Sequence, residues 1–178
     1  KNIETNIYLE DFSNGIKNSS DYVFEMIDEL IKLPVKRIML PDTLGIFNPF
    51  EVYEYVKLLV ERYPNTHFDF HPHNDYGLGV ANALAAAKAG INGLHVTVNG
   101  LGERAGNAAL DEVAVGLKDF FDIQTNIDEK ELFKISKIVE MFSGQRLPNN
   151  KPVYGSNVFT QTAGIHADGD KKGNLYVN

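Results

Sequence analysis

Residues 71–107 read HPHNDYGLGVANALAAAKAGINGLHVTVNGLGERAGN, and the fold is inferred outward from this segment. It opens where an apolar run, FDFHPH, ends in two histidines one residue apart. Alternate side chains of a strand point to one face, so His71 and His73 share a face with Asp69. Two imidazoles held side by side suit a divalent metal, and a pair of hydrogen-bonded core histidines is the competing interpretation.

The same segment continues as an alanine-rich helix and a second strand, and this strand–helix order recurs along the chain. The strand-like runs begin about 30 residues apart, which is the size of one βα unit. Four consecutive units predict a parallel sheet with right-handed crossovers. The predicted strands are residues 6–10, 36–40, 67–71 and 93–98, and the predicted helices are residues 18–33, 48–63, 78–89 and 108–121.

Two α/β architectures fit this order, a doubly wound open sheet and a (βα)8 TIM barrel. A doubly wound sheet usually carries a glycine-rich phosphate loop after its first strand, and no such loop follows residues 6–10. In a barrel, the carboxyl ends of several strands form one active site. Every predicted strand here ends in reactive side chains, which favours the barrel: Glu10 and Asp11, Asp42 and Thr43, His71 and His73, Thr97 and Asn99.

A complete barrel needs roughly 250 residues and eight strands. The 178 residues of this chain hold four strand-like runs. We therefore expect the later half of a barrel, strands 5–8, from a longer enzyme, and we expect this part alone to be inactive. The predicted division is residues 1–122 for the barrel half, 123–143 for a following helix, and 144–178 for the start of a glycine- and proline-containing linker subdomain.

The composition excludes several function classes. A net charge of −7 without a basic run argues against nucleic-acid binding. No apolar run approaches the ~20 residues that cross a bilayer. The absence of cysteine excludes disulfides, thiolate metal sites and a cysteine nucleophile. The first residues do not resemble a signal peptide, so we expect a cytoplasmic enzyme that binds neither nucleic acid nor membrane.

The loop NGLGERAGN at residues 99–107 is the second candidate site. Its glycines allow sharp turns and close approach of the backbone to a ligand. Glu103 and Arg104 either form a buried pair that holds the loop, which is the favoured interpretation, or contact the substrate. Asn107 is interpreted either as the N-cap of the next helix or as a side-chain carbonyl that reaches a metal.

The sequence allows more than one interpretation of three further segments. Asp42 and Thr43 either cap the turn after their strand or have separate roles, in which Thr43 donates to a substrate carboxylate and Asp42 binds a neighbouring strand end. Residues 74–75 (Asn-Asp) are either a helix cap or partners that orient the imidazoles. His166, in AGIHADGD, is either a solvent-exposed loop residue or part of a segment that closes over a site.

Three segments together resemble the alpha-isopropylmalate synthase family, which includes citramalate and homocitrate synthases. They are HPHND followed by GLGVANALAAAKAG, NGLGERAGNAALDEV, and AGIHADGD. The resemblance extends from residue 6 to residue 176. Pro72 departs from it, since a small residue is commoner between the two histidines.

The resemblance implies a metal-dependent Claisen condensation of acetyl-CoA with a 2-keto acid on a (βα)8 barrel. It implies that His71, His73 and Asn107 bind a divalent metal (Mg, Mn or Zn) together with a first-strand aspartate that this sequence lacks. Thr43 would bind the keto acid carboxylate. His166 and Tyr176 match catalytic linker residues that reach the site of the partner subunit in a homodimer with exchanged linkers.

The favoured reaction converts 2-ketoisovalerate to 2-isopropylmalate, in leucine biosynthesis, because NGLGERAGN looks more like the isopropylmalate and citramalate branches. Citramalate or homocitrate synthesis is the alternative within the family. Outside it, a metal-dependent barrel hydrolase and an inactive structural fragment remain as competing hypotheses.

Overall fold

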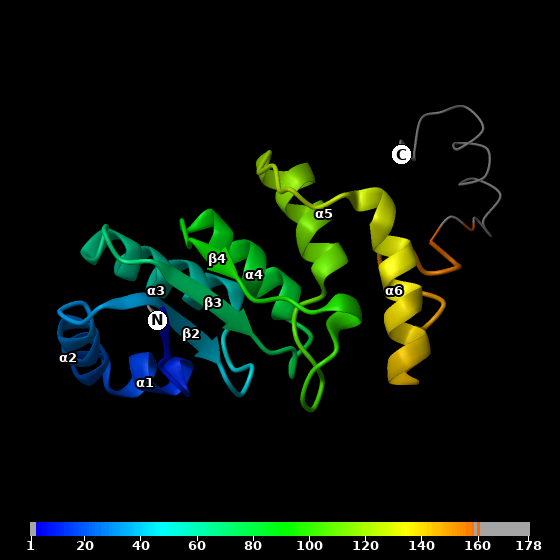
Figure 1. Ribbon diagram of the computed structural model, residues 1–178. Coiled ribbons are helices and arrows are strands. Elements are labelled where there is room, and N and C mark those ends of the chain that lie inside the picture. Colours follow the sequence, from blue (N-terminus) through cyan, green and yellow to red (C-terminus); the bar gives the residue numbers. More distant parts are fainter. Residues whose placement is uncertain (1–2, 159, 161–178) are drawn as a thin grey trace.

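A computed structural model describes residues 3–158 and residue 160, and its centre is a four-stranded parallel sheet (Figure 1). The strands are β1 (Thr5–Tyr8), β2 (Val35–Asp42), β3 (Phe68–Pro72) and β4 (Gly93–Leu94). Each strand pairs with the next one along the chain, in the order β1-β2-β3-β4. A doubly wound sheet would reverse this order at a switch point, whereas a barrel wall keeps it. The fold is therefore a partial (βα)8 barrel, as predicted.

Helices follow each strand, and the last helix lies away from the sheet, at the right of Figure 1. They are α1 (Phe12–Asn18), α2 (Ser20–Leu30), α3 (Pro49–Arg62), α4 (Gly79–Lys88), α5 (Leu110–Phe121) and α6 (Glu129–Ser143), with a 3-10 turn, η1 (Val98–Gly100). Within the described ranges, none of these helices has both the length and the apolar character needed to traverse a bilayer.

Two predicted elements differ from the structure. The helix predicted over residues 18–33 is α2, which has Ser19 as its N-cap and ends at Leu30. A separate short helix, α1, precedes it, because the backbone at Ser19 (φ −151°, ψ 50°) is not helical. The strand predicted over residues 93–98 is only two residues long. His95 still donates its backbone N–H to the Phe70 carbonyl at 2.9 Å, but beyond it the chain turns toward α5. The pattern of apolar and polar residues along the sequence did not indicate either difference.

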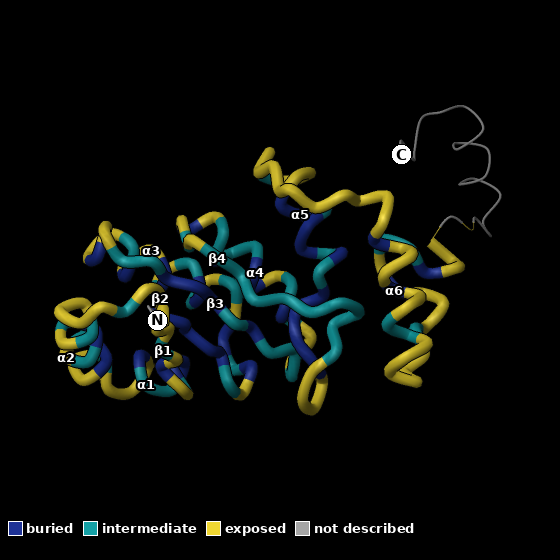
Figure 2. The backbone as a smooth tube through the Cα atoms, in the orientation of Figure 1, coloured by how far each residue is buried: buried dark blue, intermediate teal, exposed yellow. Residues whose placement is uncertain are grey.

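The hydrophobic core lies between the sheet and its helices, and the buried strand residues belong mainly to β2 and β3 (Figure 2). Phe68 and Phe70 of β3 are fully buried and pack in one cluster with Ile38 and Leu40 of β2 and with α3 residues such as Val52. Burial of such side chains contributes about 1.5–3 kcal/mol each. The opposite face of the sheet carries Tyr8, Arg37, Asp69 and His71, so the predicted division of β3 into a phenylalanine face and a histidine face is confirmed.

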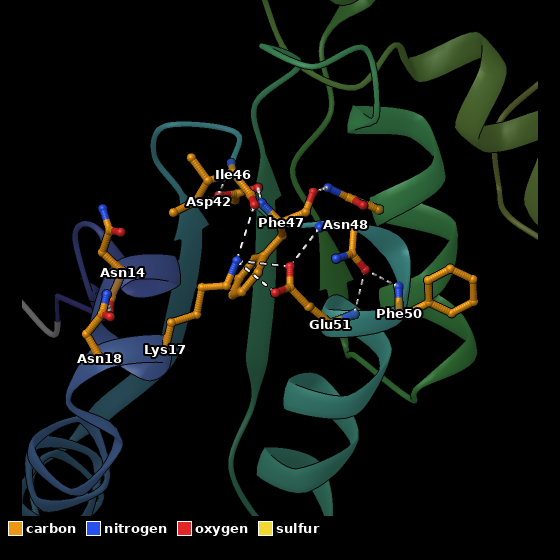
Figure 3. A network of polar contacts seen from close by, with 10 residues as sticks. Asn14, Lys17, Asn18, Asp42, Ile46, Phe47, Asn48, Phe50 and Glu51 are labelled. Carbon is orange, nitrogen blue, oxygen red and sulfur yellow. Dashed lines mark hydrogen bonds and ion pairs between the residues drawn. The ribbon is translucent and has the colours of Figure 1, made fainter.

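Polar contacts join the start of α3 to α1 and to the end of β2 (Figure 3). The Asn48 side chain accepts the backbone N–H groups of Phe50 and Glu51, and Glu51 accepts the backbone N–H of Asn48. This capping box, with Pro49 at the first helical position, confirms the predicted N-terminus. Lys17 of α1 donates to Glu51 at 3.0 Å, which joins α1 to the first turn of α3.

Replacing the cap residue tests this start of α3. The substitution Asn48→Ala should lower the free energy of unfolding by about 1 kcal/mol, because two backbone N–H groups lose their acceptor. Chemical denaturation of the full-length protein measures the change. Asn126→Ala, in the exposed loop before α6, is the control and should change stability little. Equal effects of the two substitutions would contradict the assignment.

Candidate metal centre

The structure brings together His71, His73 and Asn107, which the sequence singled out. His71 lies in β3 and His73 follows directly, with ring centroids 5.1 Å apart and tilted by 52°. Asn107 pairs with His73 as an isolated antiparallel bridge. Its side-chain Nδ2 lies 3.2 Å from His71 Nε2. One strand end and one loop therefore supply three donor side chains to a single place at the carboxyl edge of the sheet.

Asn107 is held by the backbone of two neighbouring segments. Its N–H donates to the Gly100 carbonyl at 3.0 Å, and its Nδ2 donates to the Pro72 carbonyl at 3.3 Å. A Cβ at Gly102 would collide with Asn107 Oδ1, so the loop needs glycine there. The alternative that Asn107 caps the next helix is wrong, because α5 begins at Leu110 with Ala109 as its N-cap.

The imidazoles are suited to hold a cation. Burial, followed by the nearby His73 and His95, lowers the pKa of His71, so His71 is neutral and carries a free lone pair at neutral pH. Within the part of the chain that the structure describes, His73 Nδ1 is buried without a hydrogen-bond partner. A buried nitrogen without a partner costs free energy unless a ligand satisfies it, so these residues fit a divalent metal.

No carboxylate among the described residues joins these three side chains to form a larger group of metal ligands. Among residues 3–158 and 160, no three histidine, aspartate or glutamate side chains converge in a way that could hold a metal ion. The candidate donors among the described residues are therefore two imidazoles and one amide. A half-turn of the Asn107 amide exchanges its nitrogen for its oxygen, which is the atom that divalent metals bind.

Asp42 and Thr43, at the end of β2, have separate roles. Asp42 is fully buried and accepts the backbone N–H groups of Ile46 and Phe47, so it caps the turn. The Thr43 hydroxyl donates to Glu10 at 2.7 Å. Thr43 thus lies at the carboxyl edge with its hydroxyl directed along that edge.

Arg104 connects three loops at this edge. It donates to both Asp75 oxygens at 2.8 and 2.9 Å and to the Thr43 carbonyl at 2.6 Å. These hydrogen bonds lower the pKa of Asp75. Glu103 lies 3.5 Å from Arg104 and is exposed, so the expected buried Glu103–Arg104 pair is wrong and Asp75 is the main partner. Asn74 accepts the Gly79 N–H and caps the start of α4.

Asn99 faces away from the candidate metal centre and anchors α6. Its side chain donates to the Ser136 carbonyl at 3.0 Å and accepts the Ser136 hydroxyl at 2.6 Å. The Tyr154 hydroxyl donates to the same Asn99 oxygen, and burial raises the pKa of Tyr154 to about 12. Asn99 therefore joins the loop to α6 and to the segment that follows it.

The sequence analysis did not single out His95, which lies on the inner face of the sheet. Gly93 pairs with Asp69, and by strand alternation His95 then faces the same side. His95 contacts both Asp69 and His71. The alternation of side chains along the strand-like run GLHVTV (residues 93–98) could have placed His95 on this face. His166 and Tyr176 lie outside the described residues.

A family profile described as HMGL-like matches residues 1–139. The chain belongs to the HMGL-like family. The chain is 42% identical over 157 residues to a putative (R)-citramalate synthase of Methanopyrus kandleri, covering 88% of this chain and 31% of that protein. It is 44% identical to a probable 2-isopropylmalate synthase of Archaeoglobus fulgidus, with the same two coverages. The chain spans about a third of the length of such relatives, and the resemblance seen in its motifs is confirmed.

A solved structure agrees with this membership. An HMG-CoA lyase from Acinetobacter baumannii, in complex with coenzyme A and 3-methylmalate, matches with a TM-score of 0.67 and 28% identity. The match covers 82% of this chain and 49% of that one. The sequential parallel sheet is thus shared with a barrel enzyme of the same family.

Substituting Arg104 tests the connection between the loops. Arg104→Lys keeps the charge but cannot donate to both Asp75 oxygens and the Thr43 carbonyl at once. We expect faster backbone hydrogen exchange over residues 99–107, measured by mass spectrometry. Arg62→Lys, on α3 and away from this edge, should leave that segment unchanged. Unaltered exchange in the Arg104 variant would show that the contacts do not hold the loop.

Proposed function

We propose that the full-length protein catalyses a divalent-metal-dependent condensation of acetyl-CoA with a 2-keto acid, with 2-ketoisovalerate as the favoured substrate and 2-isopropylmalate as the product. The observation that carries the proposal is the convergence of His71, His73 and Asn107 at the carboxyl edge of β3. The names of the relatives, 2-isopropylmalate synthase and (R)-citramalate synthase, support the reaction class.

In this proposal His71, His73 and Asn107 hold Mg²⁺, Mn²⁺ or Zn²⁺, with a further aspartate from outside the present sequence. The bound metal supplies Lewis-acid polarisation of the keto acid carbonyl. Thr43 would turn its hydroxyl from Glu10 to the keto acid carboxylate. A base removes a methyl proton from acetyl-CoA, the resulting carbanion bonds to the keto carbon, and water then cleaves the thioester to release CoA.

We further propose that His166 and Tyr176 are the catalytic residues of the linker and act at the site of the partner subunit in a homodimer. His166 would transfer protons as general acid or base. The division into a barrel half (residues 1–122), a following helix (123–143) and a linker subdomain (144–178) belongs to the same proposal. It is supported by α6, which follows the last βα unit.

An assay of thiol release tests the reaction. Full-length protein with acetyl-CoA and Mn²⁺ should release free CoA thiol only when a 2-keto acid is added, and 2-ketoisovalerate should be used better than pyruvate. Better use of pyruvate would identify a citramalate synthase instead. His71→Ala and His73→Ala should each abolish release, whereas His67→Ala, at the opposite end of β3, should not. Absence of thiol release with every keto acid would overturn the proposal.

The role of Thr43 is tested by Thr43→Val. Loss of one hydrogen bond to a charged carboxylate, about 1.5–3 kcal/mol, should raise KM for the keto acid by about tenfold or more. KM for acetyl-CoA should not change. Thr125→Val, in the loop after α5, is the matched control. A parallel rise in both KM values would indicate a general disturbance of the site rather than loss of a carboxylate contact.

A further inference from the structure

A path of hydrogen bonds leads from a buried carboxylate to His71. Asp69 of β3 is 1% exposed and lies on the inner face of the sheet. His95 Nε2 is 3.2 Å from Asp69 Oδ2, and His95 Nδ1 is 3.4 Å from His71 Nδ1. The other ring nitrogen of His71, Nε2, faces Asn107 at 3.2 Å.

The chemistry of the groups sets the direction of every hydrogen bond in this path. A carboxylate only accepts, so His95 Nε2 carries a hydrogen and donates to Asp69. In neutral His95 the remaining nitrogen, Nδ1, is then bare and accepts. Both of its neighbours can donate to it: the Tyr8 hydroxyl at 3.3 Å and His71 Nδ1. Two bare nitrogens would repel each other at the 3.4 Å between His95 Nδ1 and His71 Nδ1. We therefore infer that His71 carries its hydrogen on Nδ1 and that its Nε2 is left bare.

The opposite end of the path leads to the same assignment. Asn107 Nδ2 faces the Pro72 carbonyl, which can only accept, so this end of the amide is the NH₂ group. The same NH₂ group faces His71 Nε2, which must therefore offer a lone pair. With the Asn107 amide in this orientation, the Asp69 carboxylate and the Pro72 carbonyl place the hydrogen of His71 on the same nitrogen.

We propose that Asp69 and His95 are positioning residues that hold the hydrogen of His71 on Nδ1 and so present a bare Nε2 to the metal. This inference rests on the proposed metal centre. Metal-binding histidines commonly donate their second N–H to a carboxylate or carbonyl, and loss of that partner typically weakens metal binding 10–100-fold. Here a second imidazole, His95, lies between the carboxylate and the metal-binding ring.

The fold makes room for this carboxylate. Gly93 of β4 is paired with Asp69, and a Cβ at position 93 would collide with Asp69 Oδ1. Asp69 also accepts from His67 Nε2 at 2.8 Å and from Arg37 at 3.4 Å, which compensate its burial. His67 contacts the same carboxylate as His95 but lies outside the path to His71, so it offers a matched control.

The test uses the full-length protein labelled with ¹⁵N in its histidines. Long-range ¹H–¹⁵N correlation spectra show which nitrogen of His71 carries the hydrogen, and a Mn²⁺ titration gives the metal affinity. Asp69→Asn is nearly isosteric, but its amide can donate or accept and no longer imposes a direction. Gly93→Ala displaces the carboxylate without changing a polar residue, and His67→Gln is the control. Thermal unfolding by circular dichroism confirms that each variant is folded.

We expect a bare His71 Nε2 in the wild-type protein and in His67→Gln, with the same Mn²⁺ affinity. Asp69→Asn and Gly93→Ala should show both tautomers of His71 and bind Mn²⁺ about tenfold more weakly. A wild-type hydrogen on Nε2, unchanged spectra and affinity in both variants, or equal weakening in His67→Gln would overturn the inference and leave the proposed function standing. Failure of the wild-type protein to bind Mn²⁺ would overturn the metal centre and this inference together.

Discussion

The burial of Phe68 and Phe70 against the helices is the interaction on which the rest of the structure depends. Side chains of a strand alternate, so burying these two phenylalanines turns Asp69 and His71 to the opposite face. A slip of one residue would exchange the two sets and place charged groups in the apolar core. The core therefore selects the register of β3, and the register places the first donor of the candidate metal centre.

Side-chain hydrogen bonds fix the loop over residues 99–107, although it has no regular structure beyond η1. Asn107 binds the Pro72 carbonyl, Arg104 binds Asp75, and Asn99 binds Ser136 of α6. These three attachments point in different directions, toward β3, the loop before α4, and α6. The loop that carries the Asn107 side chain is thus held in position before any ligand binds, and only the Asn107 amide has to turn to present its oxygen.

Much of this arrangement was accessible from local patterns. The start of α3 was predicted at residue 48, because Asn48 and Pro49 act within the first turn of the helix. The opposite faces of β3 were predicted because alternation is a property of the extended backbone. The short helix α1 and the short β4 were not predicted, because both depend on contacts with other parts of the chain.

By itself the sequence determined the order of strands and helices, the barrel type of sheet, and the two histidines on one strand face. Only the tertiary structure decided that Asn107 faces His71 rather than capping α5, that Arg104 binds Asp75, and that His95 joins Asp69 to His71. The physical reason is distance along the chain. Each of these contacts joins segments from different βα units. No repeating pattern in the nearby sequence indicates which distant residue such a side chain will contact after folding.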